Sequence, residues 1–476
     1  MSILKGLELL KAENLCSLHM PGHKGRLKFP DIMNNIGEID ITEIPGSDNL
    51  HKAQGMILAA QERAARIFGA EKTYFLINGT TGGILSMMLS QCRPKDKILV
   101  PRNCHRSVWN GLILGDLIPI YIQPKIHPKT GIGLSISPED VEEKLREHPD
   151  IKAALITYPT FYGSCSDLKK IRELLYAKNK LLLVDEAHGA HFAFHKDLPL
   201  TALESGGDIV AQSTHKMLSS FTQSSMLHVG NSRSCSMGQL EMFLALLQST
   251  SPSYPLMASL EFAALEAERE GYIKWDNIIE WNQSAIEEIT KETSFKIVGK
   301  DLIGKHGVVD YDISRFLIDV SSTGLSGLEV DRILRKNFGI QVELSDYYHI
   351  LAMTGMGTEY NDIERFTKGL IEIYNQYKGR KQEKKYFQLP LMEEKVILSP
   401  RDAIYSPEER VKFEESIGRI SKEFIIPYPP GIPIILPGEE ITPDIIDRVK
   451  HIKSWGGEII GTQDNKLNTI NVVVEN

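Results

Sequence analysis

Seven short apolar runs, separated by segments with helical patterns, constrain the fold of this chain more than any other feature. The runs cover residues 73–77, 97–100, 118–122, 153–157, 181–184, 209–212 and 226–229. The segments before and between them carry helical start and stop signals, such as Ser137 ahead of Pro138 and Gly69 after an amphipathic stretch. Strands that alternate with helices predict an α/β fold around a mostly parallel sheet of seven strands.

After about residue 300 the alternation loosens, which indicates further domains. An apolar run at 316–320, a helical pattern at 327–337 and a strand at 340–344 predict a small α+β domain after a long connecting helix. A charged run at 378–385 is typical of a linker. The expected parts are an N-terminal arm (1–60), a large domain (61–305), a small α+β domain (306–380) and a C-terminal domain (386–476).

The composition is that of an ordinary globular protein of 476 residues. Its 54 basic residues are outnumbered by 62 acidic ones, and no long basic stretch could follow the phosphates of a nucleic acid. The five cysteines are scattered, so neither a disulfide framework nor a structural zinc site is expected. Charged residues interrupt the N-terminal leucines, and no apolar run reaches membrane-spanning length. We therefore expect a cytoplasmic protein that uses neither nucleic acid nor membrane as a partner.

The strongest local signal is an aspartate and a lysine at the ends of successive strands. LLLVDEAH (181–188) ends a buried strand with Asp185, and STHK (213–216) places Lys216 31 residues later. Ligands of open α/β sheets bind at the carboxyl ends of the strands, so both side chains should face one crevice. A lysine there can form a Schiff base with an aldehyde cofactor, and an aspartate can keep a pyridine nitrogen protonated. Either residue alone is more often a helix cap or a solvated group; together they predict a site for pyridoxal 5'-phosphate (PLP).

A glycine-rich turn, NGTTGG (78–83), lies between the first strand and a helical pattern at 84–91 and suggests a cradle for phosphate. Gly79 lets the backbone approach an anion, the hydroxyls of Thr80 and Thr81 can donate, and a helix N-terminus favours negative charge. Such a turn is as often purely structural. His105 follows the second strand and could stack on a pyridine ring, the alternative being a loop histidine without a ligand.

Six motifs occur in the order found in a known enzyme family. They are LHMPGHKG (18–25), DITEIPG (40–46), NGTTGG (78–83), NCHRS (103–107), DEAHGAH (185–191) and STHKML (213–218). With them the chain resembles, over nearly its whole length, the Orn/Lys/Arg decarboxylases, fold-type I PLP enzymes with an aspartate aminotransferase-like large domain. The segment PPGIP (429–433) is similar to part of that family's C-terminal domain. The early position of LHMPGHKG resembles the short form of Gram-positive bacteria, which lacks an N-terminal wing domain.

The resemblance implies roles for individual residues. Lys216 would bind PLP covalently, Asp185 would pair with the pyridine nitrogen, and His105 would stack on the ring. The other residues expected around the cofactor are Gly79, Thr80, Thr81, Ala187, His188, Ser213 and His215, with Thr250 and Ser251 reaching it from the neighbouring subunit. The family implies a homodimer whose active sites lie at the subunit interface.

The implied activity is removal of the α-carboxylate from a basic L-amino acid. Glu343 and Asp346 are the carboxylates expected to hold the cationic side chain, the alternative being surface carboxylates without a ligand. Lys216 or His188 would return a proton to Cα. Arginine, giving agmatine for polyamine biosynthesis, is the first expected substrate, followed by lysine (cadaverine) and ornithine (putrescine). An aminotransferase is the alternative among enzymes, and a non-catalytic binding protein is the alternative of another class.

Overall fold

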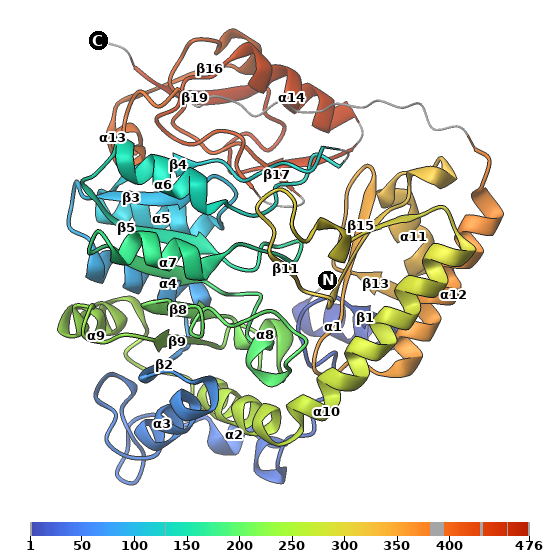
Figure 1. Cartoon of the computed structure of the whole chain (residues 1–476), viewed down its shortest axis with the longest axis horizontal. Coiled ribbons are helices and arrows are strands. Elements are labelled where there is room, and N and C mark those ends of the chain that lie inside the picture. Colours follow the sequence, from blue (N-terminus) through green and yellow to red (C-terminus); the bar gives the residue numbers. More distant parts are fainter. Residues whose placement is uncertain (1, 129, 381–394, 429–431, 455, 475–476) are drawn as a thin grey trace.

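A seven-stranded sheet lies at the centre of the computed structural model, which describes residues 2–128, 130–380, 395–428, 432–454 and 456–474. In sheet order its strands are β2 (Lys72–Leu76), β9 (Ser225–Val229), β8 (Ile209–Gln212), β7 (Leu181–Asp185), β5 (Ile151–Thr157), β3 (Lys97–Pro101) and β4 (Ile118–Ile122). Neighbouring strands are parallel except at β9, which runs antiparallel to β2 and to β8. All seven predicted strands and the mostly parallel α/β sheet are confirmed (Figure 1).

Helices cover both faces of this sheet, which explains why its strands are nearly uninterrupted apolar runs. Successive residues of a strand enter opposite cores, as Ile98 and Leu99 do. The core of Leu99 is covered by α3 (Met56–Phe68), α6 (Pro138–Glu147), α7 (Leu168–Tyr176) and α10 (Tyr254–Glu292), and that of Ile98 by α4 (Gly79–Gln91), α5 (Arg106–Gly115) and α9 (Met237–Leu247). Ser137 is confirmed as the N-cap of α6, and Gly69 as the left-handed C-cap of α3.

A second, four-stranded antiparallel sheet follows the 39-residue helix α10. Its strands are, in order, β10 (Lys296–Val298), β12 (Arg315–Asp319), β15 (His349–Met353) and β14 (Leu344–Ser345), and α11 (Gly327–Phe338) and α12 (Tyr360–Tyr377) pack against it. The prediction of one strand at 340–344 is wrong, because that segment is divided. β13 (Ile340–Val342) pairs in parallel with β1 (Cys16–Leu18), and only β14 joins the second sheet.

The C-terminal part of the chain packs beside α5 and the strand end at β3 (Figure 1). Its elements are α13 (Pro400–Tyr405), β16 (Glu408–Lys412), β17 (Ile426–Tyr428), α14 (Pro443–Ser454), β18 (Glu458–Ile460) and β19 (Thr469–Val473), with β16 paired to β19 and β17 to β18. Arg102, directly after β3, forms a buried ion pair with Glu439 at an N–O distance of 2.8 Å. Most of the predicted linker at 378–385, and residues 429–431 of PPGIP, lie outside the described residues.

The remaining α-helices and strands are α1 (Ile3–Ala12), α2 (Ile36–Ile39), β6 (Ser164–Cys165), α8 (Thr214–Met217) and β11 (Asp310–Tyr311). Within the described ranges, no helix is both long enough and apolar enough to cross a lipid bilayer. We retain the division at 1–60, 61–305, 306–380 and 386–476 as a proposal. The pairing of β1 with β13 connects the proposed arm to the proposed small domain.

Candidate active site

Several predicted residues lie at one edge of the large sheet because the strands that precede them all point there. Asp185 ends β7, α8 with Lys216 follows β8, and His105 caps α5 after β3. β2 runs in the same direction and leads into α4 at Gly79. The carboxyl ends of these strands form one polar edge, the place where open α/β sheets bind ligands.

Lys216 and His188 are in direct contact, with Lys216 Nζ 3.0 Å from His188 Nε2. His188 is buried, and its pKa falls well below the usual value because of burial, of the charge that Lys216 carries when protonated, and of the charge of Arg315. Burial also lowers the pKa of Lys216, while Asp185 and Glu343 act against that shift. The pair therefore favours a neutral imidazole beside an amine that loses its proton easily, the form in which a lysine attacks an aldehyde.

Asp185 is buried at the end of β7, where its carboxylate accepts the backbone N–H of Ala187 at 3.1 Å. Burial lowers the pKa of His105, and the neighbouring Asp185 and Lys216 raise and lower it respectively. His105 Nδ1 accepts the backbone N–H of Ser107 at 3.2 Å, which fixes the ring at the start of α5. The structure thus brings Asp185, His105 and Lys216 together.

Hydroxyl groups gather where α4 begins. Thr80 Oγ1 contacts Ser213 Oγ and lies 2.7 Å from Ser225 Oγ, and all three side chains are buried. Gly79 has a φ of +68°, in the left-handed region that favours glycine. The predicted turn before a helix at 84–91 is too long, because α4 already begins at Gly79. Hydroxyls and a helix N-terminus therefore lie together, as a phosphate site requires.

Thr81 and His215, two other residues predicted around the cofactor, differ in exposure. The side chain of Thr81 is exposed on α4. His215, in α8, has Nδ1 2.8 Å from the carbonyl of Ser224, so Nδ1 carries a proton and donates. Burial lowers the pKa of His215 to about 4.

Ser225, which completes the hydroxyl cluster, was not predicted, because a serine at the start of a strand has no distinctive sequence pattern.

Two buried basic residues in this region were also missed from the sequence. Arg315, the first residue of β12, has Nη2 3.2 Å from Nδ1 of His188. Lys24, in the LHMPGHKG motif, donates hydrogen bonds to the carbonyls of His19 at 2.5 Å and Met353 at 3.0 Å. Burial lowers the pKa of Lys24 to about 7. Both residues come from segments outside the large sheet, so no strand-end pattern marks them.

The two predicted substrate carboxylates have different surroundings. Glu343 accepts the backbone N–H of Met20 at 2.8 Å and interacts electrostatically with Lys216. Asp346 accepts the backbone N–H of Tyr348 and of His349, each at 2.7 Å, and also lies 3.0 Å from the ring Nδ1 of His349. Glu343 is therefore placed toward the proposed reactive lysine, whereas Asp346 already has three partners in its own turn.

Thr250 and Ser251 lie in the loop that joins α9 to α10. Both side chains are exposed. The backbone N–H of Ser251 donates to Ser249 Oγ at 3.2 Å, a hydrogen bond within the loop itself. Their expected role in a neighbouring subunit's site remains a prediction.

The groups at the strand ends fit PLP. Lys216 offers an amine for an aldehyde, Asp185 a buried carboxylate for a pyridine nitrogen, and the cluster at α4 offers hydroxyls for a phosphate. The buried hydroxyls of Thr157 and Thr214 find no hydrogen-bond partner among the described residues, and Thr157 is the register partner of Asp185. In the part of the chain that the structure describes, no group of His, Cys, Asp and Glu side chains could hold a metal ion.

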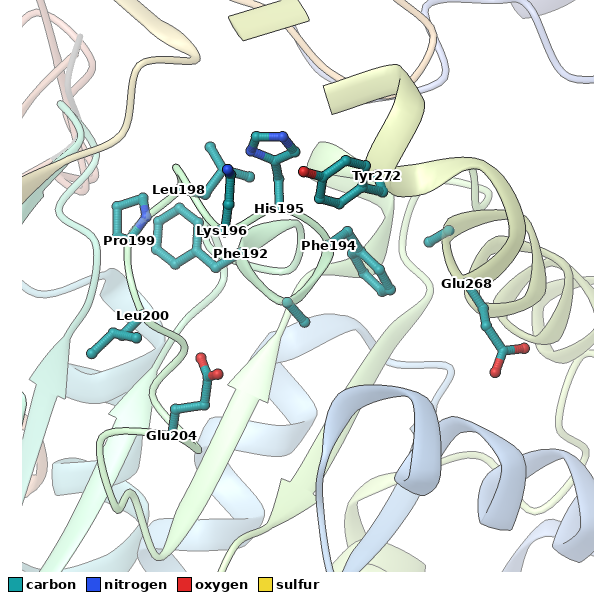
Figure 2. A pocket seen from close by; sticks show the side chains of 12 residues that line it. Phe192, Phe194, His195, Lys196, Leu198, Pro199, Leu200, Glu204, Glu268 and Tyr272 are labelled. Carbon is teal, nitrogen blue, oxygen red and sulfur yellow. The ribbon is translucent and has the colours of Figure 1, made fainter. Parts of the chain in front are cut away.

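A hollow of about 330 Å³ lies elsewhere, between α10 and a segment that consists of η3 (Phe192–Phe194) and the residues after it (Figure 2). His195 and Tyr272 stack in it with ring centroids 4.6 Å apart, and His195 Nε2 lies 3.2 Å from Asp276. None of the predicted site residues lines this hollow. The chemistry of the strand ends is therefore separate from it.

Two family sequence models match the chain. The model described as "Orn/Lys/Arg decarboxylase, major domain" matches residues 3–316, and "Orn/Lys/Arg decarboxylase, C-terminal domain" matches residues 380–463. The chain is 37% identical to the arginine decarboxylase of Bacillus subtilis, over 99% of this chain and 97% of the relative. It is also 37% identical to that of Bacillus anthracis, over 97% and 95%.

Similarity to lysine decarboxylases is lower. The lysine decarboxylase LdcA of Pseudomonas aeruginosa is 25% identical, over 93% of this chain and 75% of the relative. The crystal structure of the Francisella novicida lysine decarboxylase LdcF superimposes with a TM-score of 0.77 at 23% identity, covering 92% of this chain and 75% of that one. Ureidoglycine-glyoxylate aminotransferase of Bacillus subtilis shares the fold with a TM-score of 0.59 at 14% identity. The fold is that of fold-type I PLP enzymes, as expected.

Proposed function

The chain belongs to the Orn/Lys/Arg decarboxylase family, and from that premise we propose that it converts arginine to agmatine and carbon dioxide, with PLP bound at Lys216. Family membership makes it a PLP-dependent amino acid decarboxylase. The choice of arginine is supported by one observation. Relatives named arginine decarboxylase are 36–38% identical over 89–99% of this chain, whereas those named lysine decarboxylase are 25% identical.

The proposed division of labour follows from the geometry. When bound, PLP supplies an aldehyde for the amino group and a ring that accepts the electrons released as the carboxylate leaves. The buried carboxylate of Asp185 would keep the pyridine nitrogen protonated, and the neutral amine of Lys216 would react with the aldehyde. Lys216 and His188 are the groups positioned to hold the proton that Cα receives.

Recognition of the substrate's positive end is assigned to Glu343. Its carboxylate is held by the backbone N–H of Met20 and lies close enough to Lys216 to influence its pKa. A guanidinium group can bind such a carboxylate through two parallel hydrogen bonds, an arrangement that an ammonium group cannot match. Asp346 remains a second candidate, although its oxygens are engaged by the turn that follows it.

The test is product analysis by mass spectrometry after incubation of PLP-loaded protein with arginine, lysine and ornithine together. We expect agmatine and no keto acid, and no amine from Lys216→Ala. Cadaverine or putrescine as the main product would contradict the choice of arginine. A keto acid would show an aminotransferase, and the absence of any product would favour a non-catalytic binding protein.

We also propose that the protein acts as a cytoplasmic homodimer with shared active sites. The exposed loop of Thr250 and Ser251 supports this, because it lies on the surface where a neighbouring subunit could receive it. All five cysteines are free, as expected in a reducing compartment. Sedimentation of the full-length protein measures the oligomeric state, and a monomer at working concentrations would contradict the dimer.

A further inference from the structure

A line of polar side chains leads from Lys216 into the interior. Lys216 Nζ lies 3.0 Å from His188 Nε2, and His188 Nδ1 lies 3.2 Å from Arg315 Nη2. Beyond them, Asp312 pairs with Arg315 at 3.7 Å and with His191 at 3.2 Å. The side chains of Arg315, Asp312 and His191 have no exposed surface. The proposed reactive lysine is therefore connected to a buried ion pair through a single imidazole.

The donors and acceptors of this line fix where its protons lie. A guanidinium group has only donors, so Nδ1 of His188 must accept from Arg315. The neutral imidazole then carries its one proton on Nε2. Because Nε2–H faces Lys216 Nζ, the amine nitrogen must accept that hydrogen bond, which only a neutral amine can do.

We propose that Arg315 is a positioning residue: it holds the proton of His188 on Nε2, and His188 thereby keeps the amine of Lys216 neutral. Asp312 holds Arg315 in place, and its other oxygen accepts the backbone N–H of Ser314 at 2.9 Å. The inference rests on the proposed role of Lys216, since a neutral amine is what an aldehyde requires. It adds a residue of the second sheet to a site otherwise built mainly on the large sheet.

The charged groups around His188 and Lys216 show why the contact with Arg315 is needed. The titratable and charged groups that face His188 and Lys216 are His105, Asp185, His215, Arg315 and Glu343. The two carboxylates in this set favour a protonated Lys216, against the effect of burial. With Nδ1 unrestrained, His188 could move its proton there and accept from a charged lysine instead. The arginine contact removes that alternative.

The first test measures Lys216 in the full-length protein after cofactor removal with hydroxylamine. Reductive methylation labels only neutral amines, so peptide mass spectrometry over a pH series gives the apparent pKa of Lys216. Arg315→Met should raise this pKa by about one unit or more, because both the cation and the restraint on His188 are lost. Arg315→Lys retains a cationic donor and should stay closer to the wild-type value. Circular dichroism verifies that each variant is folded.

A double-mutant cycle separates the two ways in which Arg315 can act. In a His188→Phe background, Arg315→Met should change the Lys216 pKa far less than it does in the wild type, because the imidazole that transmits the effect is gone. An equal rise with and without the imidazole would overturn the proposal, since the guanidinium charge would then act on Lys216 directly.

A second measurement needs no variant of Arg315 and decides the matter if that variant does not fold. Nitrogen NMR of the histidine-labelled protein, with the His188 signals identified by their loss in His188→Phe, should show a proton on Nε2 at neutral pH. A proton on Nδ1, or a charged ring, would overturn the proposal. Neither readout requires turnover, so a failure of the proposed decarboxylation would be seen separately in the product analysis.

Discussion

Glu343 and Asp346 are carboxylates only three residues apart in the chain, but their partners differ. Asp346 is bound by two backbone N–H groups and a histidine ring, so it stabilises its own turn. Glu343 has one backbone partner and faces the amines of Lys216 and Lys24. The two residues should therefore respond to substitution in different ways.

Glu343→Gln should raise KM for arginine by roughly 10- to 100-fold, because a hydrogen bond to a charged group contributes about 1.5–3 kcal/mol. Steady-state kinetics with the PLP-loaded protein measures this effect. The matched control is Asp346→Asn, which should leave KM within a few-fold of wild type and lower the melting temperature instead. The reverse pattern would assign the substrate to Asp346.

The reactive residues could be predicted in part, for a physical reason. Asp185 ends a strand of one sheet, Lys216 and His105 follow other strands of it, and parallel strands place their carboxyl ends at one edge. Arg315 and Ser225 could not be predicted, since each begins a strand and reaches the site through three-dimensional packing. Strand-end patterns carry no information about such residues.

The segment between β1 and α2 is locked against α8. The N–H of Gly22 donates to the carbonyl of His215 at 2.8 Å, and the N–H of Gly357 donates to Gly22 at 2.9 Å. A Cβ atom on Gly22 would lie 2.4 Å from the carbonyl carbon of Met217, closer than any real contact. The LHMPGHKG motif therefore sets the position of the helix that carries Lys216.

Gly22→Ala should displace α8 and weaken PLP binding by roughly 5- to 100-fold, since forcing a methyl group into packed structure costs about 1–3 kcal/mol. Titration with PLP, followed by the visible absorbance of the bound cofactor, measures the affinity. Gly25→Ala is the control for the motif: its Cβ would meet nothing within 4 Å, so it adds only the backbone strain that a positive φ imposes on alanine. Equal affinity for PLP in Gly22→Ala and the wild type would show that the contact of Gly22 with α8 does not position Lys216.

A hydrogen-bonded line crosses the large sheet from β2 through β9 to β8. His228 Nε2 lies 3.0 Å from Oε1 of Gln212, whose amide group donates to Glu186 at 2.7 Å. His228 Nε2 is therefore the donor, and Nδ1 accepts from Thr73 Oγ1 at 2.8 Å. Burial lowers the pKa of His228 to about 3, so the ring is neutral in the folded protein.

His228→Gln should remove one source of acid sensitivity, because a glutamine amide offers the same acceptor and donor. In the wild type the pKa of His228 is about 3 when folded and 6.5, the ordinary histidine value, when unfolded. The free energy of unfolding therefore has its full value above pH 6.5 and decreases as the pH falls toward about 3. Each pH unit in that window costs about 1.4 kcal/mol. Chemical denaturation of both proteins over this range measures the difference. If the free energy of unfolding changed with pH equally in both proteins, the lowered pKa of His228 would be contradicted.

Secondary structure could be predicted from the sequence where a pattern of apolar residues extends over several neighbouring residues. All seven strands of the large sheet were found because both of its faces are buried and each strand is an apolar run. The pairing of β1 with β13 could not be found, because it joins two three-residue strands more than 300 residues apart. Only tertiary packing specifies such a contact.

For the assembled protein, the proposed dimer predicts complementation between defective chains. Lys216→Ala lacks the reactive amine, and a Thr250→Glu/Ser251→Glu chain would repel phosphate from the neighbouring site. Mixed dimers contain one site with an intact lysine and an intact loop, so mixing should restore about a quarter of wild-type activity if subunits pair at random. Activity assays after co-refolding measure this. Mixtures no more active than the separate variants would place the loop outside the partner's site.

The ion pair between Arg102 and Glu439 also bears on when the protein becomes active during its synthesis. Arg102 lies three residues before His105, so Glu439 supports the base of the segment that presents that ring. Translation proceeds from the N-terminus, and Glu439 leaves the ribosome after every residue of the proposed site. A nascent chain released before that point would contain the reactive groups without the support that holds one of them.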